Sequence, residues 1–107
     1  MLLKAFSLGQ NFPNPLTSVT TIEYAVAKPC QVSVGVYDVT GRLIETLADG
    51  RHQPGLCSTT WNGRDSSGNK VPSGVYFYRL SATRQGGSAS GGRAGDFTAT
   101  KQLVVLR

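Results

Sequence analysis

The sequence lacks the features of a membrane anchor and has few residues of the kinds that carry catalysis. No apolar run approaches the roughly 20 residues that a membrane-spanning helix needs, and the 107 residues include only one histidine and two cysteines. The histidine, His52, has no serine or cysteine nucleophile motif around it. Carboxylates occur singly along the chain rather than in close pairs suited to acid–base catalysis. These absences predict a non-enzymatic domain with no cofactor, no metal and no membrane span.

Charge is also sparse, and it is not concentrated anywhere. Charged residues make up 16% of the chain, and the net charge is +5 with Lys and Arg scattered along it. A scattered excess is typical of a solvated surface, and no nucleic-acid motif accompanies it, so we expect no nucleic-acid partner. The alternative is a weakly bound anionic partner such as a phosphorylated glycan or lipopolysaccharide. The low charge and the many Thr, Ser and Gly residues fit an extracellular β domain.

No segment shows a sustained apolar period of 3.6 residues, so we expect little or no helix. Instead, short runs alternate apolar and polar residues, and the 13 glycines and 5 prolines lie mostly between them. This pattern predicts an all-β, immunoglobulin/fibronectin-III-like sandwich of about seven antiparallel strands. The predicted core contains Trp61 and two strand faces, namely Ile22, Tyr24 and Val26 on one strand and Tyr76, Tyr78 and Leu80 on another.

Two parts of the chain lack this alternation. Residues 1–18 carry two prolines and two asparagines, and they predict an irregular lead-in along an edge, with the sandwich itself at residues 19–107. Residues 85–95 read QGGSASGGRAG and predict a flexible loop, of natural or engineered origin. The first four residues are too short for a signal peptide, so we expect any export signal to lie upstream.

The turn residues suggest specific local structures. Residues 39–42 predict a tight hairpin turn in which Gly41 has a positive φ. Asp65 and Gly68 predict an Asx-type turn, because a calcium loop would need more carboxylates and a different spacing. His52 lies between two glycine-containing pairs and is predicted to be a solvated loop residue.

Cys30 and Cys57 leave two readings open. Counting alternate residues places Cys30 on the same side as Val26, and Cys57 on the same face as Trp61. The two sulfur atoms could therefore approach each other, although spacing alone cannot satisfy the geometry of a disulfide. The alternative is two buried thiols that act as small hydrophobic groups.

Taken together, the motifs resemble those of the type IX secretion C-terminal sorting domain, type A. The resemblance covers residues 6–107 and is carried by LGQNFPNP at 8–15, TTIEY at 20–24, VGVYDVTGR at 34–42, WNGRD at 61–65, PSGVYFYRL at 72–80 and KQLVVLR at 101–107. The chain departs from the family in having Asn62 where Asp is usual and in its longer loop at 85–95. Several of these elements are also similar to the immunoglobulin-like domain of the flagellar hook-capping protein.

The resemblance implies a C-terminal module that directs a secreted passenger across the outer membrane and onto the cell surface. The partners it implies are the N-terminal passenger, the outer-membrane secretion machinery and a sortase-like peptidase, and we expect the domain itself to be a monomer. The family's recognition features map onto Gly74, Tyr76, Lys101, Leu103, Val105 and Arg107.

The apolar strand at 101–107 also offers a physical route to recognition. A terminal strand paired on only one side can be captured by strand addition. Two alternatives remain: a structural assembly module of the hook-cap type, and a carbohydrate-binding accessory domain. The latter would use exposed aromatics, and Tyr37 and Phe77 are predicted to form a small aromatic patch.

Overall fold

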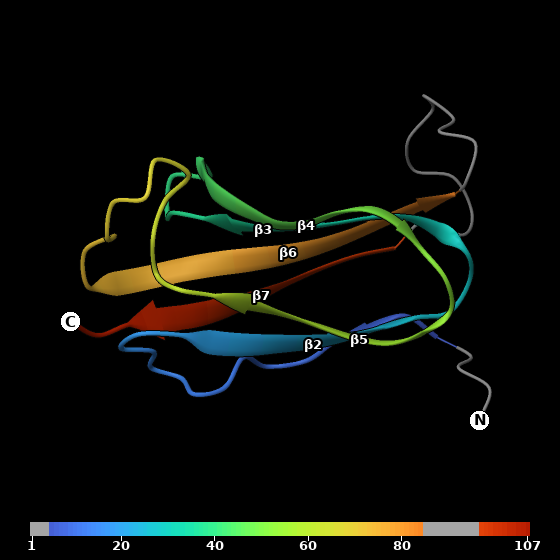
Figure 1. The fold of residues 1–107 in the computed structure, drawn as a ribbon, viewed down its shortest axis with the longest axis horizontal. Helices are drawn as coiled ribbons and strands as arrows, with labels where there is room; N and C mark the ends of the chain where they lie inside the picture. The colour runs from blue at the N-terminus through green and yellow to red at the C-terminus, as the bar shows by residue number, and fades with distance from the viewer. Residues whose placement is uncertain (1–4, 85–96) are drawn as a thin grey trace.

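The computed structural model describes residues 5–84 and 97–107, and these residues form a two-layered β-sandwich (Figure 1). The seven strands are β1 (Ser7–Leu8), β2 (Thr20–Val26), β3 (Cys30–Tyr37), β4 (Leu43–His52), β5 (Gly55–Trp61), β6 (Gly74–Arg84) and β7 (Phe97–Val105). The predicted all-β class and strand number are confirmed. The predicted loop at residues 85–95 and residues 1–4 of the lead-in lie outside the described residues.

The strands are divided between two antiparallel sheets. One sheet has the order β1-β2-β5 and the other the order β4-β3-β6-β7. β7 is therefore an edge strand, paired with β6 from Gly74↔Val105 to Ala82↔Phe97. Within the described residues no helix is found, and so none that is long and apolar enough to cross a membrane.

The core lies between the sheets and contains the predicted faces. The side chains of β2 and β6 that alternation assigns to the interior are all buried, and Trp61 is 1% exposed. The Trp61 ring packs edge-on against Tyr76 with ring centroids 5.9 Å apart. Full burial of one large apolar side chain stabilises a fold by about 1.5–3 kcal/mol. Burial of the inward side chains of β2 and β6, together with Trp61, therefore holds the two sheets against each other.

The region around His52 differs from the prediction. β4 continues through Asp49 and Gly50 and ends at His52, which is half-buried rather than a solvated loop residue. The imidazole Nε2 lies 3.0 Å from the Tyr24 hydroxyl, and Nδ1 lies 3.1 Å from the Gly50 carbonyl oxygen. The Asp-Gly pair suggested a turn, but the long pairing of β4 with β3 keeps it in the strand.

Candidate functional site

The residues that the resemblance assigns to recognition lie at one end of β6 and β7, mostly on the inner face. Leu103 and Val105 are buried, and Lys101 is half-buried on the same face of β7. Tyr76 lies opposite Leu103 and is buried, and its hydroxyl donates to the Pro72 carbonyl oxygen at 2.8 Å. A partner cannot touch these buried side chains while the domain is folded. These side chains hold β7 in place in the core and do not form a surface that a partner could contact.

Gly74 begins β6 opposite Val105. Its φ is 154°, and a Cβ built on it would meet no atom within 4 Å. The requirement for glycine here is thus conformational, because L side chains rarely adopt this φ, rather than a matter of close packing.

The outer edge of β7 presents the backbone groups of the alternate residues. The N–H and the C=O of Val104 both form hydrogen bonds with residues outside β6. In an antiparallel strand such outward groups recur at every second residue. Gln102, Thr100 and Thr98 therefore also point their backbone groups outward.

Residues 10–16, named here the edge cover, satisfy part of this edge. The Leu16 N–H donates to Val104 O, and the Leu106 N–H donates to Leu16 O, each at 2.9 Å. The Asn14 Oδ1 accepts from the Val104 N–H at 2.9 Å, and the Gln10 Nε2 donates to Gln102 O at 2.9 Å. From Gln102 onward the outer edge of β7 is therefore occupied, and the prediction of a terminal strand paired on one side only is wrong for this C-terminal half.

A buried polar cluster anchors the edge cover to both sheets, through Thr20 on β2 and Tyr78 on β6. Asn11 is 2% exposed, and its Nδ2 donates to Thr20 Oγ1 at 2.9 Å. Its backbone N–H donates to the Tyr78 hydroxyl at 2.8 Å, and that hydroxyl donates to Gly9 O at 2.7 Å. Burial raises the pKa of Tyr78, with the Asn11 N–H opposing the rise, so the phenol stays protonated and keeps both roles. Phe12 adds a backbone pair with Thr21.

Arg107 fastens the end of β7 to three neighbouring segments. Its backbone N–H donates to Ser73 Oγ at 2.8 Å. Its guanidinium donates to Val71 O at 2.9 Å and to Thr17 O at 3.3 Å, and also to Gly63 O. Figure 1 shows the chain end beside the blue lead-in loop and the yellow connection between β5 and β6.

Gly63 makes room for this guanidinium. Its φ is 73°, and a Cβ built on it would lie 2.8 Å from Arg107 Nη2 and 3.3 Å from Leu16 Cδ1. This position requires glycine both for its left-handed backbone and for the close approach of Arg107.

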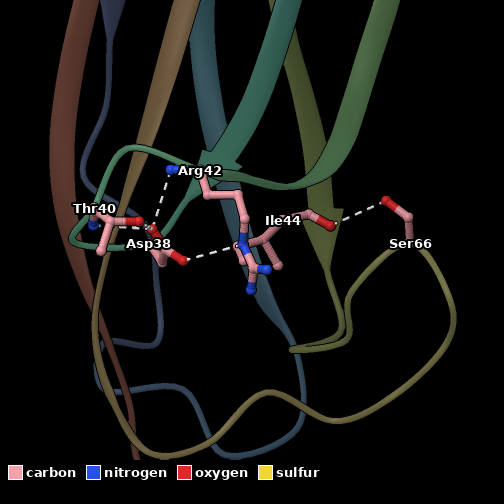
Figure 2. A network of polar contacts seen from close by, with 5 residues as sticks. All are labelled: Asp38, Thr40, Arg42, Ile44 and Ser66. Atoms are coloured by element: carbon pink, nitrogen blue, oxygen red, sulfur yellow. Dashed lines mark hydrogen bonds and ion pairs between the residues drawn. The ribbon is translucent and has the colours of Figure 1, made fainter.

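Two turns built on aspartates lie at the same end of the sandwich. Asp38 Oδ1 accepts from the Thr40 N–H and hydroxyl at 2.9 and 2.6 Å, and Arg42 Nε lies 3.4 Å from Asp38 Oδ2 (Figure 2). The hydrogen bond from the Thr40 hydroxyl is the largest cause that lowers the pKa of Asp38, and desolvation opposes it. Gly41 has the predicted positive φ, 88°.

The second turn confirms the Asx prediction. Asp65 Oδ1 accepts from the N–H groups of Ser67 and Asn69 at 3.0 and 2.9 Å. Ser66 then donates through its N–H and its hydroxyl to Ile44 O, both at 3.0 Å (Figure 2). A cleft of about 400 Å³ between the two turns is lined by both aspartates, but no group of three metal-ligating side chains occurs among the described residues.

The two cysteines are free thiols in this structure, so the disulfide that the sequence left open is not formed. Cys30 is buried at the start of β3, and Cys57 is half-buried opposite Tyr24. Burial raises the pKa of both thiols.

The predicted aromatic patch lies on the outer face of the four-stranded sheet. Tyr37 and Phe77 are direct cross-strand partners, and both are half-buried. The Arg79 guanidinium carbon lies 4.9 Å from the centroid of the Tyr37 ring. Cross-strand aromatic packing and this cation–π contact account for the pair without a ligand.

The fold and the buried C-terminal strand define an immunoglobulin-like β-sandwich. Residues 15–86 match the FlgD Ig-like domain family, and the chain belongs to this family. The basal-body rod modification protein FlgD of Salmonella typhimurium is 31% identical over 72 residues, which cover 66% of this chain and 31% of that protein. The chain therefore spans about a third of the length of this relative.

Solved structures share the fold over a larger part of the chain. FlgD from P. aeruginosa matches 80% of this chain and 61% of its own, with 24% identity and a TM-score of 0.60. Dimeric latent PorU from Porphyromonas gingivalis matches 97% of this chain and 10% of its own, with 21% identity and a TM-score of 0.71. PorZ, a surface component of the type IX secretion system of the same organism, matches 92% of this chain and 11% of its own, with 26% identity and a TM-score of 0.54.

Sequence reasoning did not find the roles of Gln10, Asn14 and Gly63. The LGQNFPNP motif was recognised, but its amides bond to residues about 90 positions away. The signal that could have suggested this role is the pairing of polar amides with prolines next to a predicted edge strand.

Proposed function

We propose that this domain is a non-catalytic sorting module that directs a secreted passenger across the outer membrane and to the cell surface. It would be exported from the cytoplasm with its passenger, and outer-membrane secretion machinery would recognise it as a folded unit. A sortase-like peptidase is the proposed partner for processing at the surface.

The observation that carries this proposal is the likeness to PorZ, which is a component of a type IX secretion system. That likeness covers 92% of the chain, so it reaches well beyond the matched family segment at residues 15–86. Most of the edge cover and all of β7 lie at or beyond the limits of that segment. They are also the parts that bond to each other, which supports a role for them that is additional to the common fold.

The test is an export assay with a folded reporter that carries a signal peptide and this domain at its C-terminus. We expect the reporter on the surface of a host with type IX machinery and in the periplasm of the same host without it. Deletion of residues 101–107 should also leave the reporter in the periplasm. Surface delivery that is independent of the machinery would contradict the proposal.

A structural assembly module of the hook-cap type is the second candidate, and the 31% identity to FlgD favours it. This reading predicts self-association of the isolated domain. Light scattering coupled to gel filtration separates the two, because the sorting proposal expects a monomer across the concentration range. A stable oligomer would favour assembly.

A further inference from the structure

Residues 6–16 run parallel to β7 and contact it along most of its length. The contacts occur in the same order along both segments, namely Phe6 with Phe97, Gln10 with Gln102, Asn14 with Val104 and Leu16 with Val105. The first is a stack of two rings with centroids 5.4 Å apart, and the last is a parallel backbone bridge. We name this set of contacts, between residues 6–16 and residues 97–106, the terminal clamp.

The direction of the two segments decides how the terminal clamp responds to force. Phe6 lies at the Phe97 end of β7, whereas Arg107 lies at the opposite end of the sandwich (Figure 1). Tension between Phe6 and Arg107 would pull the two segments past each other along their length. The hydrogen bonds that cross between them would then share the load, because none can break until the segments slide.

Buried residues oppose this sliding. Leu16 is 0% exposed and packs in the core, so sliding would draw an apolar side chain out of it. Asn11 is 2% exposed, and its N–H donates to the Tyr78 hydroxyl at 2.8 Å. That hydroxyl donates in turn to Gly9 O at 2.7 Å. Residues 9–16 are therefore fixed to β6 and to the core as well as to β7.

The other end of the terminal clamp is fixed in the same way. The Arg107 guanidinium donates to Thr17 O at 3.3 Å and to Val71 O at 2.9 Å. The first of these bonds joins the end of β7 to the residue that follows Leu16. Tension on Arg107 is therefore passed to the lead-in segment as well as to the ladder between β6 and β7.

We propose that the terminal clamp makes this domain a load-bearing module, which stays folded under tension applied between its N-terminal and C-terminal ends. Resistance to force is set by the rate of unfolding and not by equilibrium stability. In the cell, the load would come from a passenger on the N-terminal side and a partner that holds the C-terminal end. That source of load rests on the proposed sorting function, whereas the clamp does not.

Single-molecule pulling of the full chain in two directions tests the proposal. One pair of handles is attached at the two ends of the chain, so that the clamp is sheared. The other pair is attached at the N-terminal end and at Thr98, an exposed residue near Phe97, so that the same contacts are peeled apart one after another. Loss of one hydrogen bond changes a rate by about two- to tenfold. We expect unfolding to be at least about tenfold slower in shear than in peeling at equal force, and equal rates would overturn the proposal.

The double variant Gln10→Ala/Asn14→Ala separates load bearing from general stability. It removes two side-chain hydrogen bonds of the clamp, and both side chains are exposed. We expect unfolding in shear to become about tenfold faster, and unfolding in peeling to change by less than about threefold. The matched control is Gln31→Ala, an exposed amide on β3 that donates to Asp49 Oδ1 at 3.3 Å, which should leave both rates unchanged. An equal acceleration in both directions, or none in shear, would contradict the clamp.

The pulling experiment uses no export machinery, so its outcome is distinguishable from that of the sorting proposal. Failure of reporter export by the wild-type domain would remove the sorting function and leave the clamp in place. Normal export by a domain that unfolds equally fast in both pulling directions would remove the clamp and leave the sorting function in place.

Discussion

Replacing Gly63 with alanine should destabilise the domain through two separable effects. The first is the left-handed backbone, since φ is 73° and an L side chain there costs about 1–2 kcal/mol. The second is the Cβ, which would lie 2.8 Å from Arg107 Nη2 and would displace the guanidinium. Loss of one charge-assisted hydrogen bond costs about 1.5 kcal/mol, and the partial exposure of Arg107 reduces that value. We expect a total loss of about 2–3 kcal/mol.

Gly68→Ala is the matched control. Gly68 has a similar φ of 88°, but a Cβ built there would meet no atom within 4 Å. Its replacement should therefore cost only the backbone strain, about 1–2 kcal/mol. Urea unfolding monitored by Trp61 fluorescence measures both variants.

A double-mutant cycle with Arg107→Ala completes the experiment. Once the guanidinium is absent, Gly63→Ala should cost only its backbone strain, so the two substitutions should couple by about 1 kcal/mol. If the two substitutions were strictly additive in the free energy of unfolding, or if the Gly63 and Gly68 variants lost equal stability, then Gly63 would not be the residue that makes room for the Arg107 guanidinium.

Three further predictions concern stability and reactivity. Asn11→Ala removes a buried, hydrogen-bonded amide and should cost about 1–3 kcal/mol in urea unfolding, whereas the exposed Asn69→Ala should cost little. The pKa of Asp38 is lowered in the folded state, so its carboxylate stabilises the fold above the unfolded pKa of about 3.9, and this stability is lost as pH falls through the folded pKa. Asp38→Asn should therefore flatten the dependence of the melting temperature on pH between about pH 5 and pH 2. An unchanged slope of melting temperature against pH would refute this. Cys30 and Cys57 should react slowly with a disulfide reagent in the native state and fully in denaturant, and no titratable thiol in denaturant would show a disulfide.

The strands and their faces followed from local pattern. Alternation in β2 and β6 identified the buried residues, because one face of each strand packs against the opposite sheet. The same alternation placed Trp61 in the core. The hairpin turn at residues 39–42 and the Asx turn at Asp65 were also predictable, since a turn depends on residues within it.

What the sequence did not reveal depends on contacts between distant segments. His52 follows an Asp-Gly pair that usually marks a turn, yet pairing with β3 extends β4 through it. The edge cover joins residues 10–16 to the last strand, and no local rule specifies that pairing. Three of the predicted recognition residues, Tyr76, Leu103 and Val105, are buried, because a motif shows which residue types recur but not which of them reach the surface.

The most direct test of the account compares two substitutions of Thr100 in the export assay. Thr100→Pro removes an outward N–H that the ladder with β6 does not use, and places a ring on the edge that blocks strand addition. Thr100→Val keeps the backbone group and serves as the control, with the melting temperature of both confirming the fold. The account predicts surface delivery of the reporter with Thr100→Val and its retention in the periplasm with Thr100→Pro. Equal surface delivery by two folded variants would contradict recognition at the edge of β7.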